Sequence, residues 1–209
     1  MCRKSLLNSA GALIQRARER LLSRTAQTAP YAHKAARSAG RRAGHVPVEV
    51  CPPRRGFVHP ASPADIVRVL TFFGPAATYG LRRIELRQRP GLPGFGSPVA
   101  ELRAPGLVRL FEQPTPPWVL AGGLTPASRE RLERAGALIA AGPDVTRVDW
   151  PDRALRDFVL FDGLMHEIGH HTIQHAANKP RPVMRTADHE RRADLYAAYT
   201  RTAWTAATA

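Results

Sequence analysis

The sequence predicts an α+β protein in which a small mixed or antiparallel sheet precedes two long helices. Three observations support this class. Short β-like runs lie between residues 79 and 112, the strongest helical patterns follow residue 150, and basic residues concentrate near the N-terminal end. Hydrophobic residues make up 44% of the 209 residues, which is enough for one core. We therefore expect one folded domain over 46–209, preceded by a basic helix and linker over 1–45.

The N-terminal segment combines apolar pairs with an excess of arginine. Residues 1–56 carry 12 lysines and arginines and only two acids, so they hold +10 of the total charge of +14. The apolar pairs recur about seven positions apart, which predicts an amphipathic helix over roughly 5–24. Such a helix either binds a surface or a partner, or packs its leucines on the domain. The small, polar and basic run 25–45 is typical of a linker, and prolines mark the start of the domain at Pro52, Pro53, Pro60 and Pro63.

The charge distribution permits a nucleic-acid or anionic-membrane partner. This indication is weak, because nearly all the basic residues are arginines, as expected from a GC-rich genome. Cys2 and Cys51 form neither a disulfide framework nor a metal-binding spacing. No apolar run approaches the ~20 residues of a membrane-spanning helix, and the N-terminal end lacks a clean signal-peptide core. We expect a cytoplasmic protein with no transmembrane segment, and the pattern specifies no oligomeric state.

Turn and capping residues divide the domain into elements. Ser62 should cap a helix, because Pro63 and Asp65 follow it in the first turn. A second helix should begin at a cap provided by Thr125 or Ser128. The remaining patterns predict strands over 79–88, 98–103, 106–112 and 145–150, and helices over 125–140, 152–177 and 187–205.

The first of the two long helices contains the run His166-Glu167-Ile168-Gly169-His170. Histidines four apart lie on one helical face, so both imidazoles can reach one ion. Zinc suits these ligands, because it binds neutral imidazole nitrogen and tolerates an open fourth position. Glu167 would lie beside the metal, where it can take a proton from a metal-activated water and pass it to a leaving amine.

A second set of residues lies on the last helix. Glu190 follows the motif after nineteen residues, and Asp194 comes four positions later, on the same helical face. Ala193 and Ala197 lie beside them, and their small side chains would let the two helices approach closely. Glu190 is the candidate third ligand. Asp194 is expected to be a buried carboxylate that holds the ring N–H of His166.

These two runs together resemble a known family. HEIGH, nineteen residues and then ERRAD are similar to the HExxH…ExxxD pattern of the gluzincin metallopeptidases, of which thermolysin is a member. HEIGHH combined with HERRADLYA also resembles the short intracellular relatives of the ImmA/IrrE type. The resemblance covers roughly residues 155–200.

The resemblance implies a minimal zincin-like fold, in which the sheet packs on an active-site helix and a following ligand helix. Its edge strand, for which 106–112 is the candidate, would pair with an extended substrate. The implied roles are zinc ligands at His166, His170 and Glu190, a general base at Glu167, and a carboxylate behind a ligand histidine at Asp194.

Several residues near the motif keep alternative interpretations. His189 is a rival third ligand. Asp162 shares a face with His166 and could support it, or could be an ordinary surface carboxylate. The helical repeat turns His171 and His175 away from the ion. We expect each to be a surface histidine or a member of a hydrogen-bond network. The pattern singles out no residue to stabilise an oxyanion; the candidates are Tyr196, Tyr199, His175 and Arg192.

The sequence thus predicts a zinc-dependent peptidase that acts on a protein or peptide substrate. The alternative is a catalytically silent zinc-containing module whose basic arm contacts nucleic acid or a protein partner. The intact Glu167 favours the enzyme, because a purely structural site does not need a carboxylate beside the open position. The fourth zinc position separates the two, since an enzyme keeps it open and a structural site fills it with a side chain.

Overall fold

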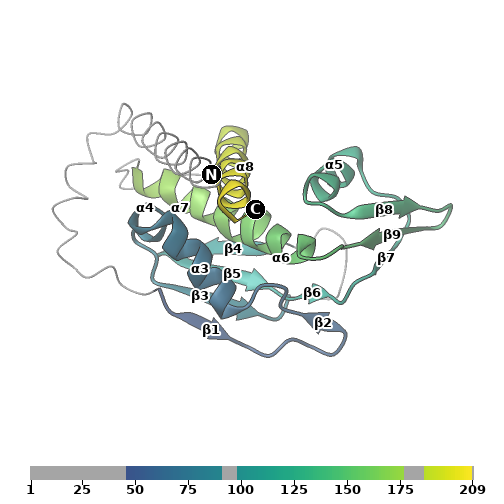
Figure 1. Cartoon of the computed structure of the whole chain (residues 1–209), viewed down its shortest axis with the longest axis horizontal. Helices are drawn as coiled ribbons and strands as arrows, with labels where there is room; N and C mark the ends of the chain where they lie inside the picture. The colour runs from purple at the N-terminus through teal and green to yellow at the C-terminus, as the bar shows by residue number, and fades with distance from the viewer. Residues whose placement is uncertain (1–45, 91–97, 177–185, 209) are drawn as a thin grey trace, which may run out of the picture.

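The computed structural model describes residues 46–90, 98–176 and 186–208 of the chain. Within them the protein is α+β, with a four-stranded, a three-stranded and a two-stranded sheet (Figure 1). The helix predicted over 5–24, the linker over 25–45 and the boundary between arm and domain lie outside the described residues. None of the described helices is long and apolar enough to cross a membrane.

The four-stranded sheet is mixed and has the strand order β1-β3-β5-β4. β1, β3 and β5 are parallel, whereas β4 is antiparallel to β5. This arrangement confirms the strands predicted between residues 79 and 112. The bounds of the strands are Val48–Val50 for β1, Arg83–Arg87 for β3, Ala100–Arg103 for β4 and Leu107–Phe111 for β5.

The edge of this sheet differs from the predicted one. The run 106–112 contains β5, which lies between β3 and β4, so the expectation that it forms an edge is wrong. β4 forms the edge instead, because the turn at Gly106 folds the two strands into a hairpin that covers the free side of β5. Gly106 has a φ of 73°, and a Cβ there would overlap the carbonyl oxygen of Gly80. Only glycine fits this turn.

Apolar side chains on one face of the sheet pack beneath the helices. Ile84, Leu86, Val108 and Leu110 alternate along β3 and β5, and each is at most 2% exposed. The helices α3 (Pro63–Phe73), α7 (His166–Ala176) and α8 (Ala187–Thr208) lie on this side of the sheet (Figure 1). The hydrophobic core therefore lies directly under the helix that carries both motif histidines.

The helix α3 begins at the predicted cap. The Ser62 hydroxyl accepts from Asp65 N at 3.1 Å, and the Asp65 carboxylate accepts in return from Ser62 N at 3.0 Å. Hydrogen bonds to Ser62 and the nearby Arg156 hold the pKa of Asp65 below its ordinary value, although burial acts in the opposite direction. The helix ends at Gly74, and the short α4 (Pro75–Thr78) leads into β3.

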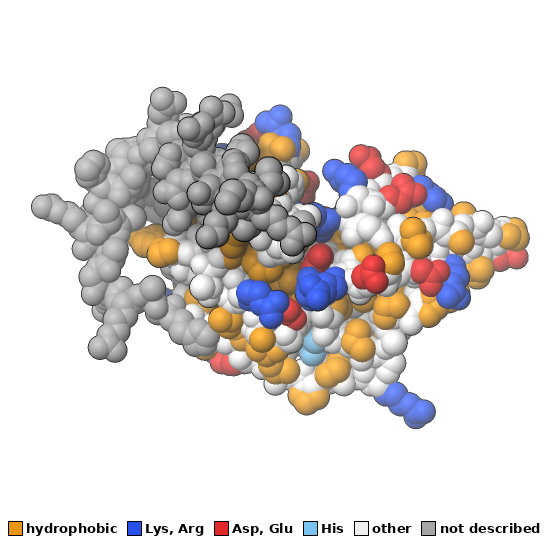
Figure 2. All heavy atoms as spheres, in the orientation of Figure 1, with side chains coloured by type: hydrophobic (Ala, Val, Ile, Leu, Met, Phe, Trp, Pro, Cys, Tyr) orange, Lys and Arg blue, Asp and Glu red, His pale blue; other side chains and the backbone are white. Residues whose placement is uncertain are grey.

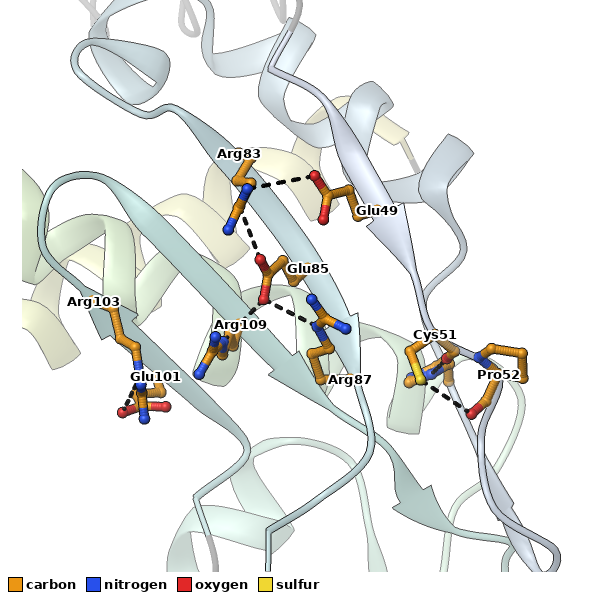
Figure 3. Close-up of polar contacts among 10 residues, drawn as sticks. Glu49, Cys51, Pro52, Arg83, Glu85, Arg87, Glu101, Arg103 and Arg109 are labelled. Carbon is orange, nitrogen blue, oxygen red and sulfur yellow. Dashed lines mark hydrogen bonds and ion pairs between the residues drawn. The ribbon is translucent and has the colours of Figure 1, made fainter.

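The opposite face of the sheet carries charged side chains that pair across the strands (Figure 3). Glu85 lies at the centre, with a fully buried side chain. The Nε atoms of Arg83, Arg87 and Arg109 lie 2.8, 3.0 and 2.9 Å from its carboxylate oxygens. The hydrogen bond from Arg87 is the largest cause that lowers the pKa of Glu85. Arg83 also lies 3.7 Å from Glu49 on β1, so the network spans three strands.

Basic and acidic side chains are interspersed on the face of the molecule drawn in Figure 2. Arginines pair with nearby acids elsewhere on the described surface too, as Arg103 does with Glu101 at 2.9 Å and Arg147 with Asp149 at 2.8 Å. These pairs offset much of the positive charge, so the face in Figure 2 does not present one continuous basic surface among the described residues.

The helix predicted over 152–177 is confirmed in extent, but its middle is a π-helix. α6 (Ala154–Phe158) continues into η1 (Val159–Met165), which leads without a break into α7. Every residue of η1 except Asp162 is buried. Phe158, Phe161, Leu164, Met165 and Ile168 are all buried along this helix. A π turn adds one residue to the helical repeat, and such turns are frequent at functional sites.

The last helix, α8, contacts α7 closely, as the small residues predict. Ala193 is fully buried, and Ala197 is 6% exposed. A Cβ placed on Gly169 of α7 would lie only 3.1 Å from the Cα of Ala193 and 3.3 Å from the Cβ of Tyr196. Glycine at position 169 is therefore what allows the two helices to come this near.

A second small sheet projects from one end of the molecule (Figure 1). Its strand order is β7-β9-β8, and it is antiparallel throughout. The strand predicted over 145–150 is confirmed, whereas the helix predicted over 125–140 is wrong in its second half. That helix ends at Arg134, because Gly136 takes a φ of 91° in the turn that follows, and β8 begins at Leu138. The bounds are β7 Trp118–Ala121, α5 Pro126–Arg134, β8 Leu138–Ala141 and β9 Val145–Asp149, and a two-stranded pair joins β2 (Phe57–Val58) to β6 (Gln113–Pro114).

Candidate metal centre

Three donor side chains from two helices converge at the start of α7. His166 and His170 lie one turn apart on α7, and Glu190 lies in the first turn of α8. The two Nε2 atoms are 3.0 Å apart, and Glu190 Oε2 lies 3.4 Å from that of His166 and 3.3 Å from that of His170. These three donor atoms form a nearly equilateral triangle, and the group could hold a metal ion.

The distances between the three donor atoms match those expected around one bound ion. Donors that share a tetrahedral ion at about 2.0–2.1 Å are about 3.3–3.4 Å apart. The three observed separations, 3.0, 3.3 and 3.4 Å, lie close to that value. The donor set is also of the kind that transition metals prefer, with two imidazoles and one carboxylate. The residues present therefore fit a metal ion.

Asp194 orients the first of the two histidines. Its Oδ1 lies 3.0 Å from Nδ1 of His166. If that ring nitrogen carries the proton and donates to Asp194, Nε2 of the neutral ring has its lone pair directed at the triangle. The structure thus places Asp194 next to His166, the histidine that the sequence predicted it would contact.

The burial expected for Asp194 is wrong. Its side chain is 71% exposed, although Ala193 and Ala197 on either side are buried. The face of α8 that meets α7 runs through these two alanines, and Asp194 lies at its margin. Solvent therefore weakens the contact between Asp194 and His166 relative to a buried pair.

Glu167 is buried beside the edge strand of the sheet. It is 5% exposed, and its Oε2 accepts from the backbone N–H of Leu102 on β4 at 3.0 Å. This N–H points away from β5, because the carbonyl of Val99 faces β5 and accepts from Phe111 N, and alternate residues of a strand face opposite ways. The carboxylate next to the first ligand histidine is therefore fixed at the outer edge of β4.

His171 and Asp162 have structural partners. His171 is only 2% exposed, and its Nε2 lies 2.9 Å from the carbonyl oxygen of Tyr79, so it belongs to a buried network. The side chain of His175 lies outside the described residues. Asp162 is ion-paired with Arg201 of α8, and burial raises its pKa despite that pairing. It does not join the donor triangle.

Among the candidates for oxyanion stabilisation, Tyr196 packs against the core. Burial raises the pKa of its hydroxyl to about 12. Arg192 is exposed and Tyr199 is half-buried, and no contact places either of them on the triangle. The structure therefore brings together His166, His170, Glu190 and Asp194, with Glu167 adjacent, and none of Tyr196, Tyr199 and Arg192 joins them in the part of the chain that it describes.

Two features of the centre were not predicted. The backbone N–H of Leu102 as a partner of Glu167 leaves no signal in the sequence, because it depends on which strand forms the edge. The burial of His189 could have been anticipated from its position, since it lies four residues before the buried Ala193 on the same helix.

Comparison of the chain with protein-family models, curated proteins and solved structures gives no match.

Proposed function

We propose that this protein is a zinc-dependent peptidase of the gluzincin kind, with a minimal zincin-like domain. The observation that carries the proposal is the triangle of His166, His170 and Glu190, with Asp194 on the outer nitrogen of His166. Two imidazoles and a carboxylate are a donor set that zinc accepts while it keeps a position open. The resemblance of HEIGH and ERRAD to the gluzincin pattern supports the same assignment.

In this proposal Glu167 is the general base. When bound, zinc would act as a Lewis acid that makes a water molecule acidic and polarises the scissile carbonyl. Glu167 takes a proton from the attacking water and transfers it to the leaving amine. The hydrogen bond from Leu102 holds the carboxylate in place for both transfers. Asp194 keeps His166 in the tautomer that directs a lone pair to the ion.

The position of Glu167 also suggests how a peptide substrate would lie. β4 is the edge of the four-stranded sheet, and Glu167 contacts its outer side. An extended peptide that pairs with β4 would therefore pass beside the carboxylate. We propose a protein or peptide segment in an extended conformation as the substrate.

A metal analysis and one conservative variant test the proposal. We expect about one zinc per chain in the full protein after reconstitution, and less than about a tenth of an equivalent would remove the basis of the proposal. Glu167→Gln should keep its zinc, because the residue is not a ligand, and should lose about 10²–10⁴-fold in hydrolysis. Cleavage can be read by mass spectrometry on proteins encoded near this one in its own genome.

The control is Glu133→Gln, which removes an exposed carboxylate of α5 that lies 3.4 Å from Arg129 and belongs to neither the donor set nor β4. It should leave both zinc content and hydrolysis unchanged. Wild-type cleavage by Glu167→Gln would show that another group is the base.

A further inference from the structure

His189, on the first turn of α8, is a buried imidazole with no hydrogen-bond partner. It is 4% exposed, and both Nδ1 and Nε2 are buried without a partner in the described structure. A neutral imidazole has one N–H donor and one acceptor nitrogen, and burying either of them without a partner destabilises the fold. A side chain with two such atoms calls for an explanation, and an ion that the ring binds is one of the recognised ones.

The ring lies beside the donor triangle. Its centroid is 5.7 Å from that of His170, compared with 4.7 Å between His166 and His170. Two imidazoles that share one tetrahedral ion, with nitrogens about 2.0–2.1 Å from it, have centroids about 5 Å apart. His189 therefore lies at a separation from His170 that suits a second histidine on the same ion.

The nearby hydroxyl of Thr186 does not account for the orphaned nitrogens. Thr186 Oγ1 lies 3.3 Å from the backbone N of His189 and contacts the main chain rather than the ring. The ring is thus held next to a metal-binding group without any competing polar contact among those the structure gives.

We propose that His189 is a fourth protein donor to the metal ion of the His166, His170 and Glu190 site. His189 is not among the three residues whose donor atoms lie within 4.8 Å of one another. Its side chain must therefore rotate towards them to bind the ion. Coordination satisfies one of the two buried nitrogens. It also completes a tetrahedral shell, which leaves no position for water or substrate.

The inference concerns regulation of the proposed zinc site, and it rests on that proposal. With His189 bound, the site is closed, so hydrolysis by the wild type comes from the fraction of molecules in which the ring is rotated away. With His189 rotated away, the site is open and Glu167 can act. The same residue therefore decides between the closed, structural type of zinc site and the open, catalytic type.

The test counts the histidines bound to zinc in the full chain. Two-bond ¹H–¹⁵N correlation spectra of the zinc-loaded protein distinguish metal-bound from free imidazole nitrogens, and His189→Gln identifies the signals of His189. We expect three histidines with a metal-bound nitrogen in the wild type and two in the variant. The variant should bind zinc about 10–100-fold more weakly. It should also bind acetohydroxamate at the metal more tightly than the wild type does, detected with cobalt in place of zinc.

His59→Gln is the control, because His59 is partly buried and its Nε2 lies 2.8 Å from the carbonyl oxygen of Cys51, away from the donor set. It should keep three metal-bound histidines and wild-type affinity. Two metal-bound histidines in the zinc-loaded wild type would overturn the role of His189 and leave the proposed peptidase intact. A wild type that binds no zinc would overturn both. The wild-type spectrum decides the question even if His189→Gln folds poorly.

Discussion

Two clusters of ionisable side chains lie on opposite sides of the four-stranded sheet, and they are built differently. On the outer face, Glu85 is surrounded by three arginines, so its negative charge is more than matched by positive neighbours (Figure 3). On the helical side, His166, His170 and Glu190 direct acceptor atoms at one another within 3.4 Å. The first cluster contains its positive partners within the fold, whereas the second brings together three side chains that could hold a metal ion.

This difference separates a structural network from a binding site. Buried charges that serve the fold are paired and hydrogen-bonded. An ion that binds such a group of donors in the folded state stabilises the fold, so the group's contribution to stability depends on a ligand. The comparison therefore predicts that variants of the two clusters respond differently to metal.

The largest effect should come from Glu190→Ala, which removes one of the three donors. We expect the zinc affinity to fall by more than the about 10–100-fold that the loss of a supporting residue costs. Competition with a chromophoric chelator measures it. Asp188→Ala removes a carboxylate two residues earlier, paired with Arg191 at 2.6 Å, and should bind zinc like the wild type. Equal affinities for the two variants would exclude Glu190 from the site.

The second effect concerns the stability of the metal-free protein. Glu85→Gln should lower the free energy of unfolding by about 1–3 kcal/mol at neutral pH. This loss is smaller than that from breaking a fully buried ion pair, because the arginines left behind can be hydrated by solvent. Urea denaturation followed by circular dichroism measures the loss. Metal affinity should change little. A variant as stable as the wild type would show that the arginine network is dispensable.

The pH dependence of Glu85→Gln follows from the lowered pKa of Glu85. The carboxylate stabilises the fold above its ordinary pKa of 4.5, and that contribution disappears as the pH falls through the lower pKa of the folded state. The difference in stability between the wild type and the variant should therefore shrink below pH 4.5. Glu101→Gln, which alters an exposed pair with Arg103, serves as the control and should show a much smaller difference at either pH.

The smallest effect should come from Asp194→Ala. The carboxylate contacts His166 but is 71% exposed, so water can replace it in part. We expect zinc affinity to fall about tenfold, the lower end of the usual range for residues that support a ligand. Asp194→Asn should lose less, because its amide oxygen can still accept from the ring N–H. If the alanine variant binds zinc as tightly as the wild type, the orientation of His166 does not depend on Asp194.

Local patterns in the sequence were sufficient for the parts of the site that lie on helices. The spacing of His166, His170, Glu190 and Asp194 is set by the helical repeat, so their shared faces could be predicted. The small residue Ala193 predicted the close helix contact for the same reason. These inferences needed no knowledge of how the strands are ordered.

The sheet could not be predicted in the same way. Which strand forms the edge depends on pairing between distant segments, so the choice of 106–112 failed even though the strand itself was present. The bond between Glu167 and Leu102 depends on that pairing too. The helix end at Arg134 was missed because Gly136 was not taken as a terminator.

Because of the π-helix η1, the direction in which the metal-binding face points depends on the number of residues between α6 and α7. Each residue of an α-helix turns the chain by about 100° and advances it by about 1.5 Å. Loss of one residue between Val159 and Met165 would restore regular α-helix and rotate α6 by about that angle against α7. Leu155 and Phe158 would then leave the core if His166 kept its direction. Substitutions within η1 alter packing, but only insertions and deletions alter the angular register between the buried face of α6 and the histidines.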